Sequence, residues 1–180
     1  MKVGIIGAGL IGTKRAEVIY NLKKDKLVSV FDIDFKKSAL LTDKFGGTAV
    51  RSKDDIFKDK TIDTVIIATW NSALAELCLE AIKNNKNVLC EKPLGINYEE
   101  SKKIFTAAKK KGITLKAGFN HRFHGSVWKA HQLVKSGAIG ELMYIRAVYG
   151  HGGRAGYDLE WRRNKKFSGG GELLEKGVHL

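Results

Sequence analysis

Residues 2–12, which read KVGIIGAGLIG, decide the fold. Residues 2–7 form an apolar run typical of a buried strand, and the apolar spacing of residues 10–22 predicts a helix. Three glycines at this junction match the pattern G-x-G-x-x-G, namely Gly7, Gly9 and Gly12. A glycine turn that leaves a strand and opens a helix is typical of sites that bind the pyrophosphate of a dinucleotide.

Each part of this glycine turn has its own predicted role. Gly7 permits the tight turn, Gly9 lets the backbone approach the pyrophosphate, and Gly12 lets the helix pack closely on the strand. The first helical turn, which contains Leu10 and Ile11, offers free backbone N–H groups to the anion. We therefore expect this turn to bind a dinucleotide.

Asp32 indicates which dinucleotide is preferred. It ends the second predicted strand, 20 residues after Gly12. A carboxylate at that point accepts hydrogen bonds from a ribose 2′-hydroxyl and repels a 2′-phosphate, so NAD is favoured over NADP. Lys36 and Lys37 follow closely and could offset this repulsion, although their simpler interpretation is as solvated residues of the next helix.

The first 120 residues alternate predicted strands and helices. The predicted strands are residues 2–7, 27–32, 47–50, 63–69, 87–90 and 113–119, and the predicted helices are residues 10–22, 35–45, 72–84 and 98–111, with a helical turn near 52–57. Strict alternation implies parallel crossovers of one hand, and hence a doubly wound parallel sheet covered on both faces. We expect this Rossmann domain of α/β class to span residues 1–120.

The pattern changes after Asn120, where we place a domain boundary. Residues 125–136 are predicted to be helical, and residues 141–149, ELMYIRAVY, alternate as a half-buried strand does. Residues 150–171 then form a glycine- and arginine-rich run without periodicity. Loops of this length are uncommon in compact domains and tend to be functional or flexible.

Further candidate residues follow the fourth and fifth predicted strands. Ligands of such folds bind beyond the carboxyl ends of the strands, so Thr69 and Asn71 are expected near the cofactor. Lys92 precedes Pro93, and the proline ring restricts both residues to a stiff, extended turn. An ordinary charged turn has the same sequence, but a rigid lysine beside a nicotinamide is suited to orient or protonate a substrate oxygen.

Taken together, these motifs resemble the glucose-fructose oxidoreductase, inositol dehydrogenase and rhizopine catabolism protein (Gfo/Idh/MocA) family. The matching segments are the glycine turn, Asp32, EKP at 91–93, GFNHRF at 118–123 and GGGELLEKGVHL at 169–180. The resemblance implies an NAD(P)-dependent oxidoreductase acting on a sugar, cyclitol or sugar-nucleotide. It also implies that residues 121–180 begin a second, α+β domain with an open antiparallel sheet, which often serves oligomerisation.

The resemblance also implies roles for three residues. Lys92 corresponds to the active-site lysine of the family and His179 to its acid/base histidine. Glu175 stands where the family usually has aspartate, so the charge is kept and one methylene is added. In a helix over 172–180 these two side chains would share a face, and the carboxylate would orient the histidine.

The remaining candidates lie near these motifs. The predicted cofactor-binding set is completed by Glu91, Lys92, Pro93 and Asn120, and the candidates for either substrate or cofactor are Arg122, Trp161 and Arg162. Trp161 and Arg162 suit a loop that closes over a ligand, but equally a basic loop with one packing aromatic. The family pattern is also broken at Leu74, where many members have histidine, and at Trp70, which replaces their proline.

The predicted chemistry is hydride transfer between NAD and a secondary alcohol. A histidine with a near-neutral pKa would take the hydroxyl proton while a cation stabilises the developing oxyanion. Two alternatives remain open. One is a non-catalytic module that senses dinucleotides, and the other is redox-neutral sugar chemistry in which NAD oxidises the sugar only transiently.

The composition of the chain limits the classes of partner that we expect it to bind. The net charge is +13, but the lysines are scattered over predicted helix exteriors, so a nucleic-acid surface is not favoured, while an anionic substrate is compatible. No stretch approaches the roughly 20 apolar residues of a membrane span, and we expect a cytoplasmic protein. Cys78 and Cys90 are predicted to be reduced core residues, and no metal site is expected.

The sequence stops one residue after His179. We expect the 180 residues to be an incomplete enzyme that ends inside its active-site helix, and the complete protein to be a homo-oligomer. Expressed alone, the chain should bind NAD through residues 1–120 with little dehydrogenase activity. Residues beyond about Gly150 should be mobile or ordered only by another copy.

Overall fold

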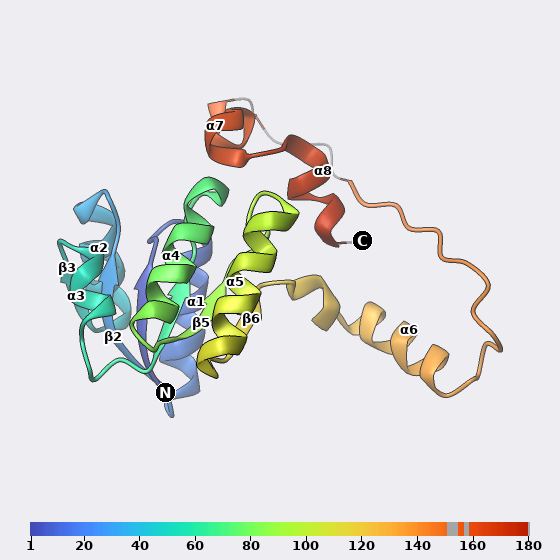
Figure 1. The fold of residues 1–180 in the computed structure, drawn as a ribbon, viewed down its shortest axis with the longest axis horizontal. Helices are drawn as coiled ribbons and strands as arrows, with labels where there is room; N and C mark the ends of the chain where they lie inside the picture. Colours follow the sequence, from blue (N-terminus) through green and yellow to red (C-terminus); the bar gives the residue numbers. More distant parts are fainter. Residues whose placement is uncertain (151–154, 157–158, 180) are drawn as a thin grey trace.

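A six-stranded sheet with helices on both faces forms the body of the molecule (Figure 1). The structure is a computed structural model, and it describes residues 1–150, 155–156 and 159–179. The strands are β1 Lys2–Ile6, β2 Lys26–Phe31, β3 Thr48–Val50, β4 Thr64–Ile67, β5 Asn87–Cys90 and β6 Leu115–Ala117. The helices between them are α1 Leu10–Leu22, α2 Phe35–Phe45, α3 Lys53–Phe57, α4 Asn71–Lys83 and α5 Tyr98–Lys111.

The strand order is β3-β2-β1-β4-β5-β6, and each neighbouring pair is parallel. The chain therefore winds outward from β1 in one direction and, after a crossover, outward from β4 in the other. This confirms the predicted doubly wound sheet. The reversal between β1 and β4 leaves a crevice beyond the strand ends, where such folds bind ligands.

Two hydrophobic cores cover the two faces of the sheet. On one face, α1 and α2 contribute Ala16, Ile19, Leu41 and Phe45. On the other face α3, α4 and α5 pack a larger cluster, which includes Phe57, Leu74, Cys78 and Ile104. Both cysteines are buried and free, as predicted. Leu74 is fully buried, so this departure from the family pattern serves packing.

The turn between β1 and α1 has no room for side chains at two of its glycines. A Cβ on Gly12 would lie 1.9 Å from the carbonyl oxygen of Gly7, and a Cβ on Gly7 would lie 2.4 Å from that of Ala68. Gly7 also has a φ of +99°. Gly9 differs, because nothing lies within 4 Å of its Cβ position. Gly7 and Gly12 are therefore required by the fold, whereas Gly9 leaves open space at the helix N-terminus.

After β6 the chain leaves the sheet. It forms the short 3-10 helix η1 Asn120–Phe123 and then α6 Gly125–Lys135, which projects away from the sheet in Figure 1. The strand predicted over residues 141–149 does not form. A strand needs a neighbour to pair its backbone N–H and C=O groups, and the described residues after β6 contain no other strand. Its apolar side chains are exposed, with Met143 at 90% and Val148 at 87%.

The C-terminal segment returns to the sheet domain. Its described elements are η3 Trp161–Arg163, α7 Lys165–Ser168, α8 Gly171–Glu175 and η4 Gly177–His179. Figure 1 shows α7 and α8 beyond the ends of α4 and α5. The single helix expected over 172–180 is broken after Glu175, because Gly177 disfavours helix interior and a helix this short has little stability of its own. Leu180 lies outside the described residues.

Among the helices that the structure describes, none is long and apolar enough to cross a membrane.

Gly12→Ala is predicted to lower the free energy of unfolding by at least about 2 kcal/mol, because the new methyl group meets backbone rather than a flexible side chain. Gly9→Ala is the matched control. Its φ of −75° suits alanine and its Cβ position is open, so its stability should stay within about 0.5 kcal/mol of the parent. Urea unfolding of both variants measures this. Equal stability of Gly12→Ala and the parent would contradict the packing described above.

Candidate active site

The predicted site residues meet at one edge of the sheet. The glycine turn follows β1, Asp32 follows β2, Asn71 follows β4 and Lys92 follows β5. All six strands are parallel, so these residues emerge at the same, carboxyl edge. The sequence therefore brings together the cofactor candidates and the candidate lysine through topology alone.

The N-terminus of α1 can accept an anion. Gly9 occupies the cap position, no side chain caps the helix, and the first turn contains no acidic residue. The backbone N–H groups of the first turn and the positive end of the helix dipole therefore face open space above Gly9. This geometry fits the pyrophosphate of a dinucleotide.

Asp32 is held in place by two backbone groups. Its Oδ2 accepts a hydrogen bond from the Ala8 N–H at 2.7 Å, and its Oδ1 accepts one from the Asp34 N–H at 2.9 Å. A carboxylate has about four acceptor positions, so capacity remains for a ribose diol. Lys37, which could offset the repulsion of a 2′-phosphate, lies 3.9 Å from the Asp34 carboxylate.

Lys92 reaches across to the C-terminal segment. Its Nζ donates hydrogen bonds to the Glu175 carbonyl oxygen at 2.8 Å and to Glu175 Oε2 at 3.0 Å. Both side chains are largely buried. The peptide bond between Lys92 and Pro93 is cis. Lys92 therefore has a charged partner from a distant part of the chain.

Asn71 completes the surroundings of this carboxylate. Its Nδ2 donates one hydrogen bond to the Ser168 carbonyl oxygen at 2.9 Å and another to Glu175 Oε1. Arg162 adds a weaker contact, with its Nε 3.5 Å from Glu175 Oε2. Burying a carboxylate is costly unless it is paired and hydrogen-bonded, and these donors supply that compensation. We call Lys92, Asn71 and Glu175 the carboxylate cluster.

The carboxylate cluster differs from the arrangement expected from sequence. Glu175 was expected to orient His179, but among the described residues its carboxylate contacts Lys92, Asn71 and Arg162. Since the helix ends at Glu175 and a 3-10 turn follows, Glu175 and His179 no longer share a helical face. Asn71 was expected beside the cofactor, but its side-chain amide donates both of its hydrogen bonds to protein groups, Ser168 and Glu175.

The glycine run before α8 allows the close approach of this segment. Gly169 has a φ of +82°, and a Cβ there would lie 2.5 Å from Ile96 Cγ2 in the loop after β5. Two residues earlier, the Phe167 ring packs on the Trp70 ring with centroids 4.5 Å apart. Trp70, which replaces the proline usual in the family, thus contributes to docking the C-terminal segment on α4.

Glu91 also has a protein partner. Its Oε1 accepts a hydrogen bond from Arg15 Nε at 2.8 Å and a second from an Arg15 terminal nitrogen. This ion pair links α1, which begins at the glycine turn, to the turn that holds Lys92. The sequence analysis missed Arg15, because nothing in the sequence pairs a helix residue with one 76 positions later.

His179 lies in a group of aromatic rings. Its imidazole stacks on that of His121 with centroids 3.9 Å apart and planes 18° apart. Burial, then the neighbouring His121 and Lys92, lower the pKa of His179 to about 4. The expected near-neutral pKa is therefore wrong for this structure. Sequence reasoning also missed His121, although it lies between the candidates Asn120 and Arg122.

The other candidates have less defined surroundings. Asn120 and Arg122 are exposed, and Thr69 is half-buried. The Arg162 guanidinium lies over the Trp161 ring, 4.7 Å from its centroid, and also pairs with Glu160 at 2.6 Å. Trp161 and Arg162 thus contact each other, which fits the alternative of a basic loop with a packing aromatic. No group of potential metal ligands occurs in the described part of the chain.

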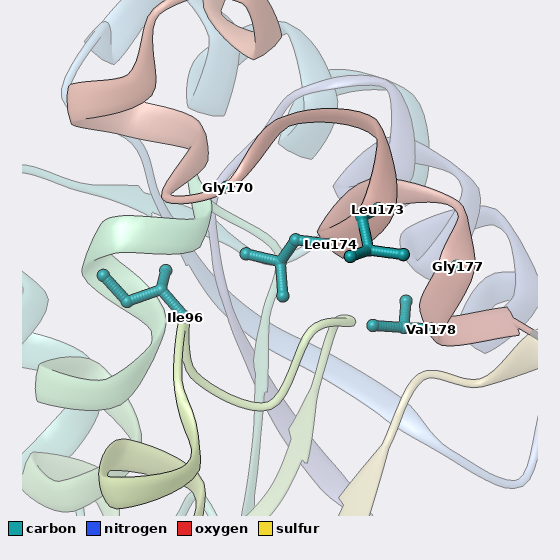
Figure 2. A pocket seen from close by; sticks show the side chains of 6 residues that line it. All are labelled: Ile96, Gly170, Leu173, Leu174, Gly177 and Val178. Carbon is teal, nitrogen blue, oxygen red and sulfur yellow. The ribbon is translucent and has the colours of Figure 1, made fainter.

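An apolar hollow of about 450 Å³ lies beside the C-terminal segment. Figure 2 shows side chains from the loop after β5 and from α8 and η4 around it. The lining residues are Ile96, Gly170, Leu173, Leu174, Gly177 and Val178. These side chains offer no polar anchor, so this hollow does not supply the chemistry of the site.

The strand order, the glycine turn and the charged residues at the carboxyl edge define a dinucleotide-binding α/β protein. Residues 1–119 match the model of the oxidoreductase family with an NAD-binding Rossmann fold, and residues 127–180 match that of the Gfo/Idh/MocA C-terminal domain. The chain belongs to the Gfo/Idh/MocA oxidoreductase family.

Known proteins similar to the chain include enzymes of sugar metabolism. Glucose-6-phosphate 3-dehydrogenase of Bacillus subtilis is 30% identical over 99% of this chain and 51% of its own length. The 2,7-anhydro-N-acetylneuraminate hydratase of Escherichia coli is 31% identical over 93% of this chain and 44% of its own. A solved levoglucosan dehydrogenase complex with NADH and levoglucosan has a TM-score of 0.88 and 27% identity, over 100% of this chain and 52% of that chain. The chain spans about half the length of these relatives.

Glu175→Ala is predicted to loosen the C-terminal segment, because it removes the acceptor of Lys92 and Asn71. The Ser168 and Gly169 amides, which are hydrogen-bonded within α7, should exchange with solvent more readily, by about 1.5–3 kcal/mol of opening free energy. Glu175→Asp keeps the charge, so exchange at these two amides should be intermediate between the parent and Glu175→Ala.

The matched control is Glu76→Gln, since the Glu76 side chain is 77% exposed and its ion pair lies at the surface. It should change exchange at these amides by less than about 0.5 kcal/mol. Hydrogen exchange followed by mass spectrometry measures all three variants. Unchanged exchange at Ser168 and Gly169 in Glu175→Ala would show that the carboxylate cluster does not hold this segment.

Proposed function

We propose that the protein is an NAD-dependent oxidoreductase that transfers a hydride between nicotinamide and a secondary alcohol of a sugar carrying a negative charge. The observation that supports this most is the meeting of the anion-accepting turn at Gly9 with Lys92 and His179 at one sheet edge. The neighbouring Lys92 contributes to lowering the pKa of His179, which supports a site in which both side chains serve one substrate.

The roles follow from the chemistry of alcohol oxidation. NAD supplies the acceptor for the hydride that leaves the alcohol carbon. His179 accepts the hydroxyl proton, and its low pKa keeps the imidazole neutral and able to do so at physiological pH. Lys92 stabilises the negative charge that develops on the oxygen. Glu175 fixes the position of the Lys92 ammonium group.

Asp32 supports the choice of NAD over NADP. Its carboxylate is anchored by the N–H groups of Ala8 and Asp34, so it cannot easily turn away from an incoming 2′-phosphate. Of the two lysines that could compensate, Lys36 and Lys37, the second lies beside Asp34 instead. We propose that residues 1–120 form the cofactor domain and that residues 121–180 belong to the substrate domain.

A charged sugar is supported by the basic side chains and by two relatives. Lys92 lies at the site, Arg122 is exposed next to His121 in the sequence, and the chain has a net charge of +13. Glucose-6-phosphate and 2,7-anhydro-N-acetylneuraminate, in the names of the two relatives, are both anionic sugars. The exposed apolar side chains of residues 142–149 support a homo-oligomer, which we also propose.

A second candidate is redox-neutral chemistry. The relative from Escherichia coli is named a hydratase, and addition of water to a sugar involves no net oxidation. In this case NAD would be reduced and reoxidised within one turnover. Lys92 and His179 would have the same roles in the oxidation step, so the site geometry is compatible with both candidates.

The 180-residue chain is predicted to bind NAD at least about tenfold more tightly than NADP, and Asp32→Ser should remove most of this preference. Isothermal titration of both cofactors into both proteins tests it. Gly9→Ala should weaken NAD and NADP binding alike, because its methyl group would occupy the space for the pyrophosphate. Tighter NADP binding by the parent would show that Lys36 and Lys37 outweigh Asp32.

Turnover is tested on the protein as its gene encodes it, with NAD and a panel of sugar phosphates, sugar acids and neutral cyclitols. NADH should accumulate with an anionic sugar, and Lys92→Ala and His179→Ala should each lower turnover by roughly 100-fold or more with little change in NAD affinity. Glu175→Gln should have a smaller effect, because it positions Lys92.

The other outcomes identify the alternatives. Conversion of a sugar without accumulation of NADH would support redox-neutral chemistry. NAD binding with no conversion of any sugar would support a sensing module instead of an enzyme. Lys92→Ala with parental turnover would contradict the role given to that lysine.

A further inference from the structure

His121 has no role in the function proposed so far, yet it makes the closest ring contact of His179 in the described structure. The two imidazoles are nearly parallel, with centroids 3.9 Å apart. His124 also stacks on His121, with centroids 4.7 Å apart. Tyr149 meets the edges of both His121 and His179, at 5.0 and 5.8 Å. Three separate chain segments thus form one stack of rings.

We propose that His121 is a positioning residue that keeps His179 in its neutral form, by covering one face of the imidazole and placing a second ionisable ring against it. His121 contacts His179 and is not assigned a contact with the reacting atoms. The proposal rests on the proposed function only for its catalytic consequence. The protonation state itself is a property of the chain without any substrate.

Hydrogen bonding at His179 supports the neutral form. Its Nδ1 is buried and has no hydrogen-bond partner among the described residues. A ring that is partly buried and has no partner at Nδ1 is costlier to hold in its charged form, because a buried charge needs hydrogen bonds to compensate for lost solvation. The Nδ1 atom is itself buried, so solvent does not reach it as a substitute partner.

The charges around His179 act in the same direction. The groups that act on it are Lys92 in the turn after β5, His121 in η1, His124 at the N-cap of α6 and Glu175 at the end of α8. Among the described residues, only Glu175 favours a protonated histidine, and its carboxylate is already paired with Lys92. Burial first, and then His124 and Lys92, also lower the pKa of His121.

The catalytic consequence is a wide pH range in which His179 can accept a proton. A histidine of ordinary pKa loses this capacity as the pH falls through about 6.5. With the stack intact, the loss is moved to a pH near the lowered pKa of about 4. Without the stack, the acid limb of the activity profile should move back toward neutral pH.

The direct test is an NMR titration of the histidine ring signals in the 180-residue chain. The chain has five histidines, and His179→Gln identifies the signal of His179 by its loss. In the parent, the His179 signal should remain constant from alkaline pH to about pH 5. In His121→Ala its pKa should rise by about one unit or more, because water reaches the exposed ring face.

Two variants separate the stack from general disruption. His121→Phe keeps a flat ring at this position without an ionisable group. The pKa of His179 in this variant should therefore be closer to that of the parent than to that of His121→Ala. His131→Ala removes an exposed histidine on α6 and should change nothing. Amide spectra of residues 1–119 should be the same in all variants, which shows that the sheet domain remains folded.

The proposal is overturned if His179 of the parent titrates near its ordinary pKa. It is equally overturned if His121→Ala leaves that pKa unchanged. If His121→Phe behaves like His121→Ala, coverage of the ring face is contradicted as a cause. In the enzyme as its gene encodes it, the acid limb of kcat/KM should move with the NMR-derived pKa. A confirmed pKa shift together with absence of turnover would contradict the proposed function alone.

Discussion

The ion pair between Lys92 and Glu175 is the contact on which the site depends, because it joins residues 83 positions apart. A buried carboxylate is tolerated only when donors surround it, and Lys92 and Asn71 supply them from the ends of β5 and β4. The same contact brings the C-terminal segment to the sheet edge. His179 follows four residues later, so its place beside Lys92 depends on this pair.

The parallel sheet explains why the cofactor and the chemistry share one edge. Every strand ends on the same side, so the free helix N-terminus at Gly9, the carboxylate of Asp32 and the ammonium group of Lys92 are collected without any local sequence relation. Arg15 and Glu91 connect two of these strand ends directly. The cofactor turn and the candidate catalytic turn are therefore parts of one packed unit.

The fold could be predicted from sequence because its signals are local. The strand and helix patterns of residues 1–120 and the glycine turn depend on spacing, and the structure confirms them. The prediction of a strand over residues 141–149 was wrong. Alternation of apolar and polar residues describes a side-chain pattern but does not show that a second strand is present to pair with. The prediction that Glu175 and His179 share one helical face was wrong, because the helix ends before Gly177. Arg15 and His121 were missed, because their contacts exist only after the chain folds.

The central claim is that cofactor and C-terminal segment act at one sheet edge. Hydrogen exchange of the 180-residue chain with and without saturating NAD tests it most directly. The account predicts added protection in residues 7–12, in the turn that holds Lys92 and in residues 168–179, with no change in α6. Protection confined to the glycine turn, with residues 168–179 unaffected, would contradict it.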